Sequence, residues 1–486
     1  MINEIPLSLI PGNYVSIDGS QAIQGLSSQR ARVLLFGTKL SGGTATALVP
    51  VKITREDQGD DLFGVGTPLA EMCRLFRKHN KISELTVIPQ AEAGGGAKAS
   101  NTVTFTGTAT ASGSLYIYVG GRRFVVPVAE GDTNEDVAAA TEDVINADPR
   151  AYVDALVDGV NADELDLTSK WKGASANYLS VEFNYYSDEA FPPGITASAT
   201  AFASGATDPT LSAAIAVMGD TQYHTVLMPW TDTTNLNALK TTMEARWGAT
   251  ARNEGLTIAA YRETYSNTQS LGNGRNSKTE VIFGTAKAPT PPWEYSAVFA
   301  AVEAAITDPA APRFGLALPD VLPPKLESNR FTETERGLLL ADGISTVRVG
   351  AGGVVYTESV LTTWQVNELD IEDDSFQWIE TLRCASYFRQ DMLVFLGSRF
   401  KDHKVADDET PIGPGQKVAT PALVRAAVLG RYALYERQAI CEGGAEFADS
   451  LVVERHANDP GRMDILSYPD FVNQLRNIAV RESFIV

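Results

Sequence analysis

An α/β rhythm that stops and later resumes is the feature that most constrains how this chain can fold. Val33–Phe36 is a continuous apolar run that ends at Gly37, as is typical of a buried strand. A helix is predicted from Thr67, with Pro68 at its first position, and Leu85–Ile88 has the pattern of a second strand. Because a helix between two buried strands marks a βαβ unit, we expect an α/β core to begin in residues 29–96.

The rhythm stops in residues 97–207. Thr102–Thr108 and Leu115–Val119 are β-prone, and Gly120-Gly121 predicts a hairpin turn directly after them. One helix is expected after Thr133, a residue that can cap it. We interpret this stretch as an inserted, mainly-β domain.

The α/β rhythm returns in residues 208–365. Strand-like runs lie at Thr225–Met228, Leu256–Ala260 and Glu280–Phe283, and a helix is expected between the first two. The same rhythm on both sides of an interruption is what an insertion into one domain predicts. Residues 29–96 and 208–365 are therefore expected to share a sheet. Ile344–Trp364 is predicted to form a β-hairpin with a glycine-rich turn.

Two helices are expected in residues 366–475. Apolar side chains keep a helical period from Trp378 to Leu396, over about five turns. The second helix is predicted to start near Thr420-Pro421, after a polar loop. The two chain ends, residues 1–28 and 476–486, are too short to form a core and are expected to be extended arms.

Charge excludes some classes of partner. The chain carries 40 Lys and Arg against 60 Asp and Glu over 486 residues, a formal net charge of −20. Because nucleic-acid binding gains affinity from cationic side chains on phosphates, we expect neither nucleic acid nor an anionic membrane surface as a partner. The charge suits an abundant protein that must stay dispersed, or a basic partner surface, and leaves both open.

No apolar run approaches the ~20 residues that a membrane-spanning helix needs, so membrane insertion is not expected. The segment Met1–Pro11 has no basic region ahead of its short apolar run, which argues against a signal peptide. Synthesis and assembly in a cytoplasm are the expectation.

Motifs for catalysis, cofactors and metals are missing from the sequence. No Gly-x-Ser-x-Gly nucleophile turn occurs, and Gly64-Val65-Gly66 lacks the third glycine of a dinucleotide loop. No two histidines have the spacing of a helical metal pair; the four are His79, His224, His403 and His456. The acidic residues Asp370, Glu372, Asp373 and Asp374 lack the glycine and distal Glu of a calcium loop, and a solvated loop is favoured. We predict no catalytic, cofactor or metal site.

A series of short motifs runs in order along nearly the whole chain. They are Ile10–Val15, Ala22–Leu26, Asp61–Gly64, Thr104–Ala109, Gly131–Thr133, Arg246–Gly248, Gly274–Ser277, Asp308–Ala310, Leu338–Thr346, Leu361–Trp364 and Val472–Arg476. Each motif alone is weak, but in this order the sequence resembles the tail sheath proteins of Mu-like contractile phages. It departs from them at Lys278-Thr279, where the family commonly has Pro-His, and at Trp364, where it often has Tyr. The departures leave the local loop packing open.

The resemblance implies an α/β core of subtilisin-like topology without a catalytic triad, an inserted peripheral domain and terminal arms. It implies a structural protein of the virion tail and no enzyme: subunits stack as hexameric rings around a tail tube and contract to drive that tube through the envelope of the target cell. The implied partners are other copies of the chain, the tail tube protein, and baseplate and tail terminator proteins. No cofactor is implied.

In such an array the arms would add strands to the sheets of neighbouring subunits. The candidate arm strands are Tyr14, Val15, Ser16 and Ile17 at one end and Ser483, Phe484, Ile485 and Val486 at the other. The tube contact is expected from a helix of residues 366–475. Arg425, Arg431 and Arg437 are the candidates for facing an acidic tube, although their six-residue spacing does not place them on one helix face.

Several alternatives stay open. A headless bacteriocin-like particle or another contractile injection machine would use the same subunit, and a degenerate subtilisin-like hydrolase is an alternative of another class. Cys73, Cys384 and Cys441 form no Cys-x-x-Cys pair and are interpreted as reduced, wholly or partly buried thiols. A disulfide between subunits, formed once a particle leaves the cell, is the other interpretation.

Overall fold

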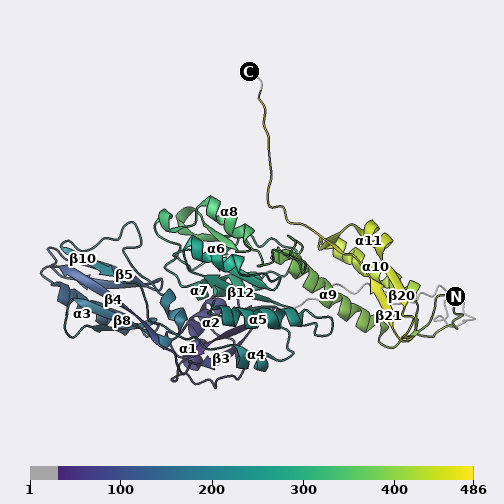
Figure 1. The fold of residues 1–486 in the computed structure, drawn as a ribbon, viewed down its shortest axis with the longest axis horizontal. Coiled ribbons are helices and arrows are strands. Elements are labelled where there is room, and N and C mark those ends of the chain that lie inside the picture. Colours follow the sequence, from purple (N-terminus) through teal and green to yellow (C-terminus); the bar gives the residue numbers. More distant parts are fainter. Residues whose placement is uncertain (1–30, 485–486) are drawn as a thin grey trace, which may run out of the picture. The chain divides into compact units, whose positions relative to one another are not determined.

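A computed structural model describes residues 31–484 (Figure 1). It forms two compact units, one made of residues 389–472 and the other of residues 31–388 with 473–484. The division falls inside helix α9 (Ile379–Phe400), whereas the sequence placed a boundary before residue 366. The candidate arm residues Tyr14–Ile17, Ile485 and Val486 lie outside the described residues.

The larger unit is built on a sheet that has six strands within the described residues. Their order is β13-β12-β11-β1-β3-β2, and all are parallel except the edge strand β2. The strands are β1 (Arg32–Lys39), β2 (Val51–Ile53), β3 (Glu84–Ala91), β11 (Thr225–Leu227), β12 (Leu256–Tyr261) and β13 (Glu280–Gly284). The five parallel strands follow the order 2-1-3-4-5 of flavodoxin-like doubly wound sheets. β1 pairs with β3, which precedes the insertion, and with β11, which follows it.

Helices cover both faces of this sheet because successive strand residues point to opposite sides. In β1, Val33 and Leu35 belong to one buried cluster, and Leu34 and Phe36 belong to the other. The first cluster includes side chains of α2 (Pro68–His79) and α7 (Pro292–Ala304). The second includes side chains of α4 (Ser212–Met218) and α5 (Thr233–Arg246). Helix α1 (Gln58–Phe63) packs on α2, and α6 (Tyr265–Asn273) packs on α8 (Glu333–Ala341).

The helix predicted from Thr67 is confirmed as α2. The Thr67 hydroxyl accepts a hydrogen bond from the Ala70 N–H at 3.1 Å, and Pro68 occupies the first turn. The preceding strand extends to Lys39, past its predicted end at Gly37. Helix α2 crosses β1 at Gly37 and leaves no room for a side chain there. A Cβ at this position would lie 2.8 Å from Leu69 Cδ1.

Replacing Gly37 by Ala should destabilise the fold by about 1–3 kcal/mol, because the added methyl group overpacks the contact between β1 and α2. The midpoint of urea unfolding measures the effect. Gly94→Ala is the matched control, since nothing lies within 4 Å of the Cβ it would add. Equal midpoints for the two variants would show that the contact tolerates a side chain.

The insertion contains two antiparallel sheets, one α-helix and a short 3-10 helix, Ala174–Tyr178. The strand orders are β10-β4-β8-β7 and β6-β5-β9. The elements are β4 (Lys98–Gly107), β5 (Gly113–Val119), β6 (Arg122–Val128), α3 (Asn134–Ala147), β7 (Val153–Val157), β8 (Glu164–Lys172), β9 (Val181–Phe183) and β10 (Ile195–Ala199). The predicted Gly120-Gly121 turn is confirmed, with φ of 55° and 78°. Between β7 and β8 a loop exposes 90% of Val160, and Gly159 beside it has open space around it.

The rest of the larger unit includes the predicted hairpin, β15 (Thr346–Val349) and β16 (Val355–Ser359), with β14 (Ala317–Leu318) beside β16. The smaller unit holds the second part of α9, and α10 (Pro421–Arg437) starts at the predicted Thr420-Pro421. Its other elements are β17 (Lys404–Val405), β18 (Val418–Ala419), β19 (Cys441–Glu442), α11 (Gly444–Ser450), β20 (Val452–Arg455), β21 (Met463–Leu466) and β22 (Asp470–Phe471).

Candidate assembly surfaces and the core–insert junction

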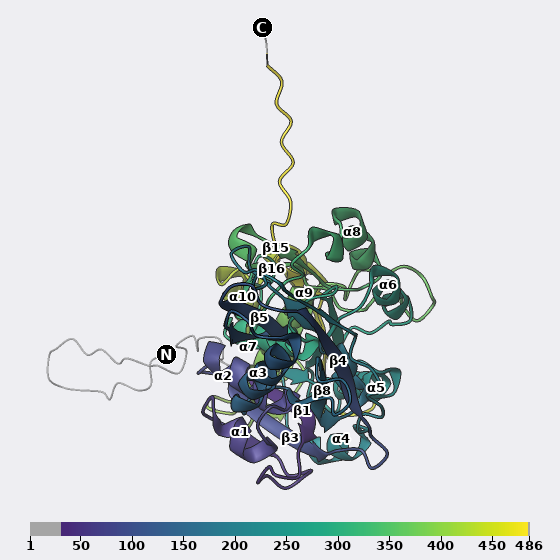
Figure 2. The same ribbon diagram turned by 90° about the vertical axis from the view of Figure 1, so that its left-hand side faces the viewer.

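The C-terminal arm, residues 476–486, is described as far as Phe484. No strand is assigned between residues 473 and 484, and Figure 1 and Figure 2 show this segment as an extended chain. Ile478, Val480 and Phe484 are 75%, 74% and 89% exposed. Alternate residues of an extended chain share a face, so these three side chains lie on one face, with the charged Glu482 between Val480 and Phe484. The candidates Ser483 and Phe484 thus lie on a segment with unpaired apolar side chains.

The smaller unit has short sheets with open edges. Within residues 389–472, β20 and β21 form a two-stranded antiparallel sheet in which Val452 lies opposite Leu466. These two side chains are 48% and 53% exposed. A two-stranded sheet is marginally stable in water, and its outer edges present backbone N–H and C=O groups to any further strand. This hairpin was not expected from the sequence.

The three candidate tube-contact arginines lie on α10 in different surroundings. Arg437 is exposed, and Arg425 is half-buried and donates a hydrogen bond to the Ala448 carbonyl. Arg431 is buried, with 5% of its side chain exposed. The sequence treated the three as equivalent, but only Arg437 presents its side chain freely on the described surface of its unit.

Arg431 belongs to a buried charge cluster. Its Nε and Nη2 donate to the two carboxylate oxygens of Asp391 at 2.7 and 2.5 Å, and its guanidinium lies 4.8 Å from the centre of the Phe395 ring. The Tyr435 hydroxyl donates to Asp391 at 2.5 Å. Burial and the neighbouring carboxylate raise the pKa of Tyr435, so this phenol stays protonated. The cluster joins α9 to α10 inside the smaller unit.

Asp391→Asn should destabilise the smaller unit by about 3 kcal/mol, because Arg431 would keep its charge in a buried place without a carboxylate. Hydrogen exchange of residues 389–472 measures the loss. Arg437→Ala should leave exchange unchanged, since exposed side chains away from such clusters contribute within about 0.5 kcal/mol. Unaltered exchange in Asp391→Asn would show that the ion pair does not hold the two helices.

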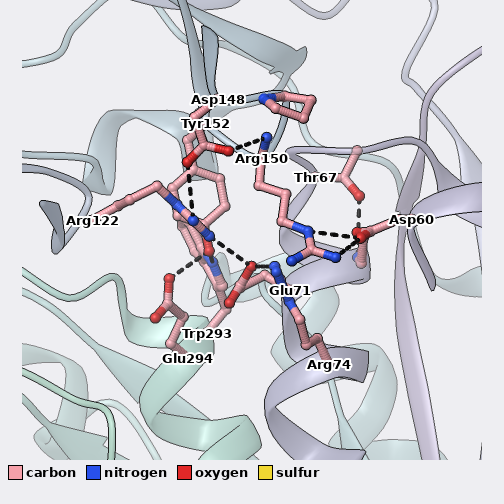
Figure 3. A network of polar contacts seen from close by, with 12 residues as sticks. Asp60, Thr67, Glu71, Arg74, Arg122, Asp148, Arg150, Tyr152, Trp293 and Glu294 are labelled. Atoms are coloured by element: carbon pink, nitrogen blue, oxygen red, sulfur yellow. Dashed lines mark hydrogen bonds and ion pairs between the residues drawn. The ribbon is translucent and has the colours of Figure 1, made fainter. Parts of the chain in front are cut away.

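Charged side chains bridge the insertion and the core (Figure 3). Arg122, at the start of β6, lies 3.4 Å from Glu71 of α2 and 3.2 Å from Asp148. Arg150 reaches Asp60 of α1 with two nitrogens, each at 3.0 Å. Two ion pairs, Arg122–Glu71 and Arg150–Asp60, therefore cross from the insertion to the core, and rotation of the insertion would break both.

A buried carboxyl group lies beneath these ion pairs. The Tyr152 hydroxyl of the insertion donates to Glu294 of α7 at 2.5 Å, and the Trp293 indole N–H donates to the same hydroxyl at 3.3 Å. The Tyr152, Trp171 and Trp293 rings meet edge to face, with centroids 5.6–5.8 Å apart. Burial raises the pKa of Glu294 to about 7. A single buried contact thus links the aromatic centre of the junction to a titratable group.

The stabilisation that Glu294 contributes should fall as pH rises. Its ordinary pKa is 4.5, so between about pH 4.5 and 7 the native state holds a proton that the unfolded state has lost. The contribution is complete below pH 4.5 and is lost as pH passes through 7. Glu294→Gln cannot ionise and can still accept from Tyr152. It should exceed the wild type in stability by about 1–3 kcal/mol at pH 8, with the gap closing towards pH 5. Urea unfolding across that range measures the gap, and a gap independent of pH would contradict this titration.

The described residues include three cysteines, all buried, and no cluster suited to a metal ion. Cys73, Cys384 and Cys441 are all buried, so the expected burial of these side chains is confirmed. Burial raises the pKa of Cys441 to about 12, which keeps the unreactive thiol form. Between residues 31 and 484, no group of three or more His, Cys, Asp or Glu side chains is arranged to hold a metal ion. Over the same residues, no helix has the length and apolar character needed to cross a membrane.

Two protein-family models match this chain. The model of the phage tail sheath protein central domain matches residues 204–363, and the model of the phage tail sheath C-terminal domain matches residues 372–485. The chain is 36% identical over 487 residues to the Mu-like prophage FluMu tail sheath protein of Haemophilus influenzae, covering 100% of this chain and 99% of that protein. This chain belongs to the phage tail sheath family. The resemblance drawn from its motifs is confirmed.

Solved sheath structures show weaker likeness. The sheath tail protein of Desulfitobacterium hafniense has a TM-score of 0.47 at 10% identity, covering 95% of this chain and 100% of that one. The sheath tail protein of Listeria innocua has a TM-score of 0.48 at 10% identity, covering 92% and 97%. The contracted helical sheath of the anti-feeding prophage has a TM-score of 0.48 at 13% identity, covering 98% and 99%. At these values the family assignment rests on the sequence matches.

Lys278 and Trp364, which depart from the family pattern, both contact the ring of Phe376. Lys278 Nζ lies 4.8 Å from the centre of the Phe376 ring, and the Trp364 ring meets Phe376 edge to face at 5.6 Å. Lys278 also lies 5.6 Å from the Trp247 ring. A cation over an aromatic face is stabilising. The loop packing that the sequence left open is thus a compact arrangement in which both changed positions share a partner.

Sequence reasoning missed the junction residues Arg122, Tyr152 and Glu294. They come from separate elements, and no spacing relates them. The buried tyrosine, tryptophan and glutamate carried no periodic signal of their own. The usable hint was Trp293-Glu294 at the start of a helix that is apolar on every side, where a carboxyl group must find a partner.

Proposed function

We propose that this chain is the repeating subunit of a contractile sheath: it polymerises as stacked hexameric rings around a tail tube and contracts to drive the tube through the envelope of a target cell. The observation that carries the proposal is the row of exposed apolar side chains on the C-terminal arm of a chain in the tail sheath family. A contact between different patches of identical subunits generates a ring where the rotation between copies closes and an open helical array where it does not. Both phages and headless injection particles would use such a subunit.

The C-terminal arm supplies a strand to a neighbouring copy. Backbone hydrogen bonds of an added strand hold two copies together without fixing one orientation between them. Ile478, Val480 and Phe484 gain burial in the process, and the apolar residues Ile485 and Val486 extend the same run. The exposed pair Val452 and Leu466 on the β20–β21 hairpin makes that sheet the best-suited acceptor. The N-terminal residues Tyr14–Ile17 act likewise.

Contraction is a rigid-body rotation and outward shift of subunits with the arms as hinges. The ion pairs and aromatic contacts of the junction support motion of core and insertion as one body. Energy is stored in the contacts of a kinetically trapped extended form, so no nucleotide and no catalytic step is required. A serine-reactive probe tests this: labelling of the native protein would favour the hydrolase alternative. A subtilisin-like topology remains a prediction about the core.

The tube protein, the baseplate and the tail terminator are the further partners, in a virion tail assembled in the host cytoplasm. Arg437 is the most accessible of the three arginine candidates, and Arg425 follows it. Arg431 contributes by holding α10 in place, since its charge is already paired with Asp391. Baseplate association follows from the position of the first ring in any such sheath.

Deleting Ser483–Val486 should abolish polymerisation and leave the folded subunit intact, because the arm loses its apolar end while the core keeps all its contacts. Negative-stain microscopy and sedimentation measure assembly, and circular dichroism measures folding. Arg481→Ala, an exposed change on the same arm, should still form tubes. Normal sheaths from the deletion variant would remove the C-terminal arm from the assembly mechanism.

A further inference from the structure

The root of the C-terminal arm is fixed to the larger unit. Side chains here alternate: Gln474 and Arg476 are half-buried, whereas Asn473, Leu475 and Asn477 are exposed. Gln474 Nε2 donates to the Ala310 carbonyl at 3.0 Å, and Arg476 Nη2 donates to Gln474 Oε1 at 2.9 Å. From residue 477 to 484 every residue is exposed. Attachment therefore stops at Arg476.

Arg476 makes two strong contacts with the start of α9. Its guanidinium stacks on Trp378, 3.5 Å from the centre of the ring, and lies 3.5 Å from the carboxylate of Glu380. Glu380 has only 2% of its side chain exposed. Its other oxygen accepts a hydrogen bond from the Arg313 backbone N–H at 2.8 Å. The arm is thus held by a planar stack and by a charge buried in the protein.

The charges continue inward to the central sheet. Arg313 is buried, and its guanidinium lies 3.7 Å from Glu303 of α7. Glu303 accepts from Arg383 with both oxygens, at 2.8 and 2.9 Å. Arg383 in turn donates to the His224 carbonyl at 2.7 Å and to the Thr225 hydroxyl at 2.8 Å, where β11 begins. We call Arg476, Glu380, Arg313, Glu303 and Arg383 the anchor ladder.

Stability alone does not account for such a ladder. Buried ion pairs cost so much desolvation that apolar residues of similar volume stabilise a fold as well. Breaking one partner away, however, leaves a buried charge uncompensated and is strongly opposed. The buried carboxylate of Glu380 therefore resists detachment of Arg476, and the backbone N–H of Arg313 carries the connection on to the ion pairs of Glu303. β11, at its inner end, is flanked by strands on both sides.

We propose that the anchor ladder is a tension path, which ties the arm root to the central parallel sheet so that a neighbour pulling on the arm moves the whole core. The pivot of the arm then lies at Asn477, immediately after the last anchored residue. This inference rests on the proposed function, in which the arm links copies. Trp378 and Arg476 hold the root of the arm in place in that linkage.

Limited trypsin digestion of the unassembled full-length chain tests the anchor. Cleavage after Arg476 requires its side chain to leave Trp378 and Glu380, whereas Arg481 is exposed and serves as an internal reference. Glu380→Gln keeps the acceptor for the Arg313 N–H and removes the charge. It should raise cleavage after Arg476 about tenfold relative to Arg481, because the guanidinium then faces a buried neutral amide in place of the Glu380 carboxylate. Trp378→Phe should raise it less. Equal cleavage at both sites in the wild type would overturn the anchor.

Pulling tests the path. With handles at the C-terminus and in the exposed Gly94-Gly95 loop, the wild type should resist until the core opens. Arg476→Lys, which keeps the cation and loses the planar stack, should release the arm root at a lower force and with a short length gain, as should Glu380→Gln. Arg481→Ala should match the wild type. Release of the wild-type root before the core opens would overturn the tension path.

Failure of the arm deletion to block assembly would instead refute the linkage and leave the anchor intact.

Discussion

The packing of β1 between two layers of helices is the constraint on which the rest of the larger unit depends. Its run of apolar residues divides by parity: Val33 and Leu35 support one helical layer, and Leu34 and Phe36 support the other. A shift of one residue in register would exchange the two layers. Because β1 pairs with β3 on one side and β11 on the other, the same strand holds together segments that are separated by the whole insertion.

The insertion shares its buried apolar cluster with the core and is not an independently packed domain. Side chains of β4, β8 and α3 belong to the same apolar cluster as those of α2 and α7. Over that apolar contact lie the ion pairs of Arg122 and Arg150, which fix orientation more than they add stability. The Gly94-Gly95-Gly96 stretch, which suggests a joint, therefore precedes a domain that is held in place by contacts far from it in sequence.

The elements that sequence reasoning found are those with a strong apolar signal. The buried strands around Val33 and Leu85 are short apolar runs, and helix α2 and the long helix α9 carry apolar side chains at a helical period. Helix α6, Tyr265–Asn273, was missed because polar residues dominate it, and the hairpin β20–β21 was missed because its strands are short and mix charged with apolar residues. The burial of Arg431 was not foreseen because its partner Asp391 lies forty positions away, and charge alone does not reveal burial. The apolar residues of the arm were readable from sequence, whereas the anchoring of Arg476 depends on Trp378 and Glu380, which lie far earlier in the chain.

The loop between β7 and β8 has a consequence for how such particles diversify. Val160 projects almost entirely into water, and Gly159 has room on every side. Added residues at this tip would lengthen a surface turn without entering the core or the junction, and longer loops cost little in closure entropy. Repeated in every copy of the chain, the tip offers a regular set of positions for inserted sequences that leave the core and the junction unchanged.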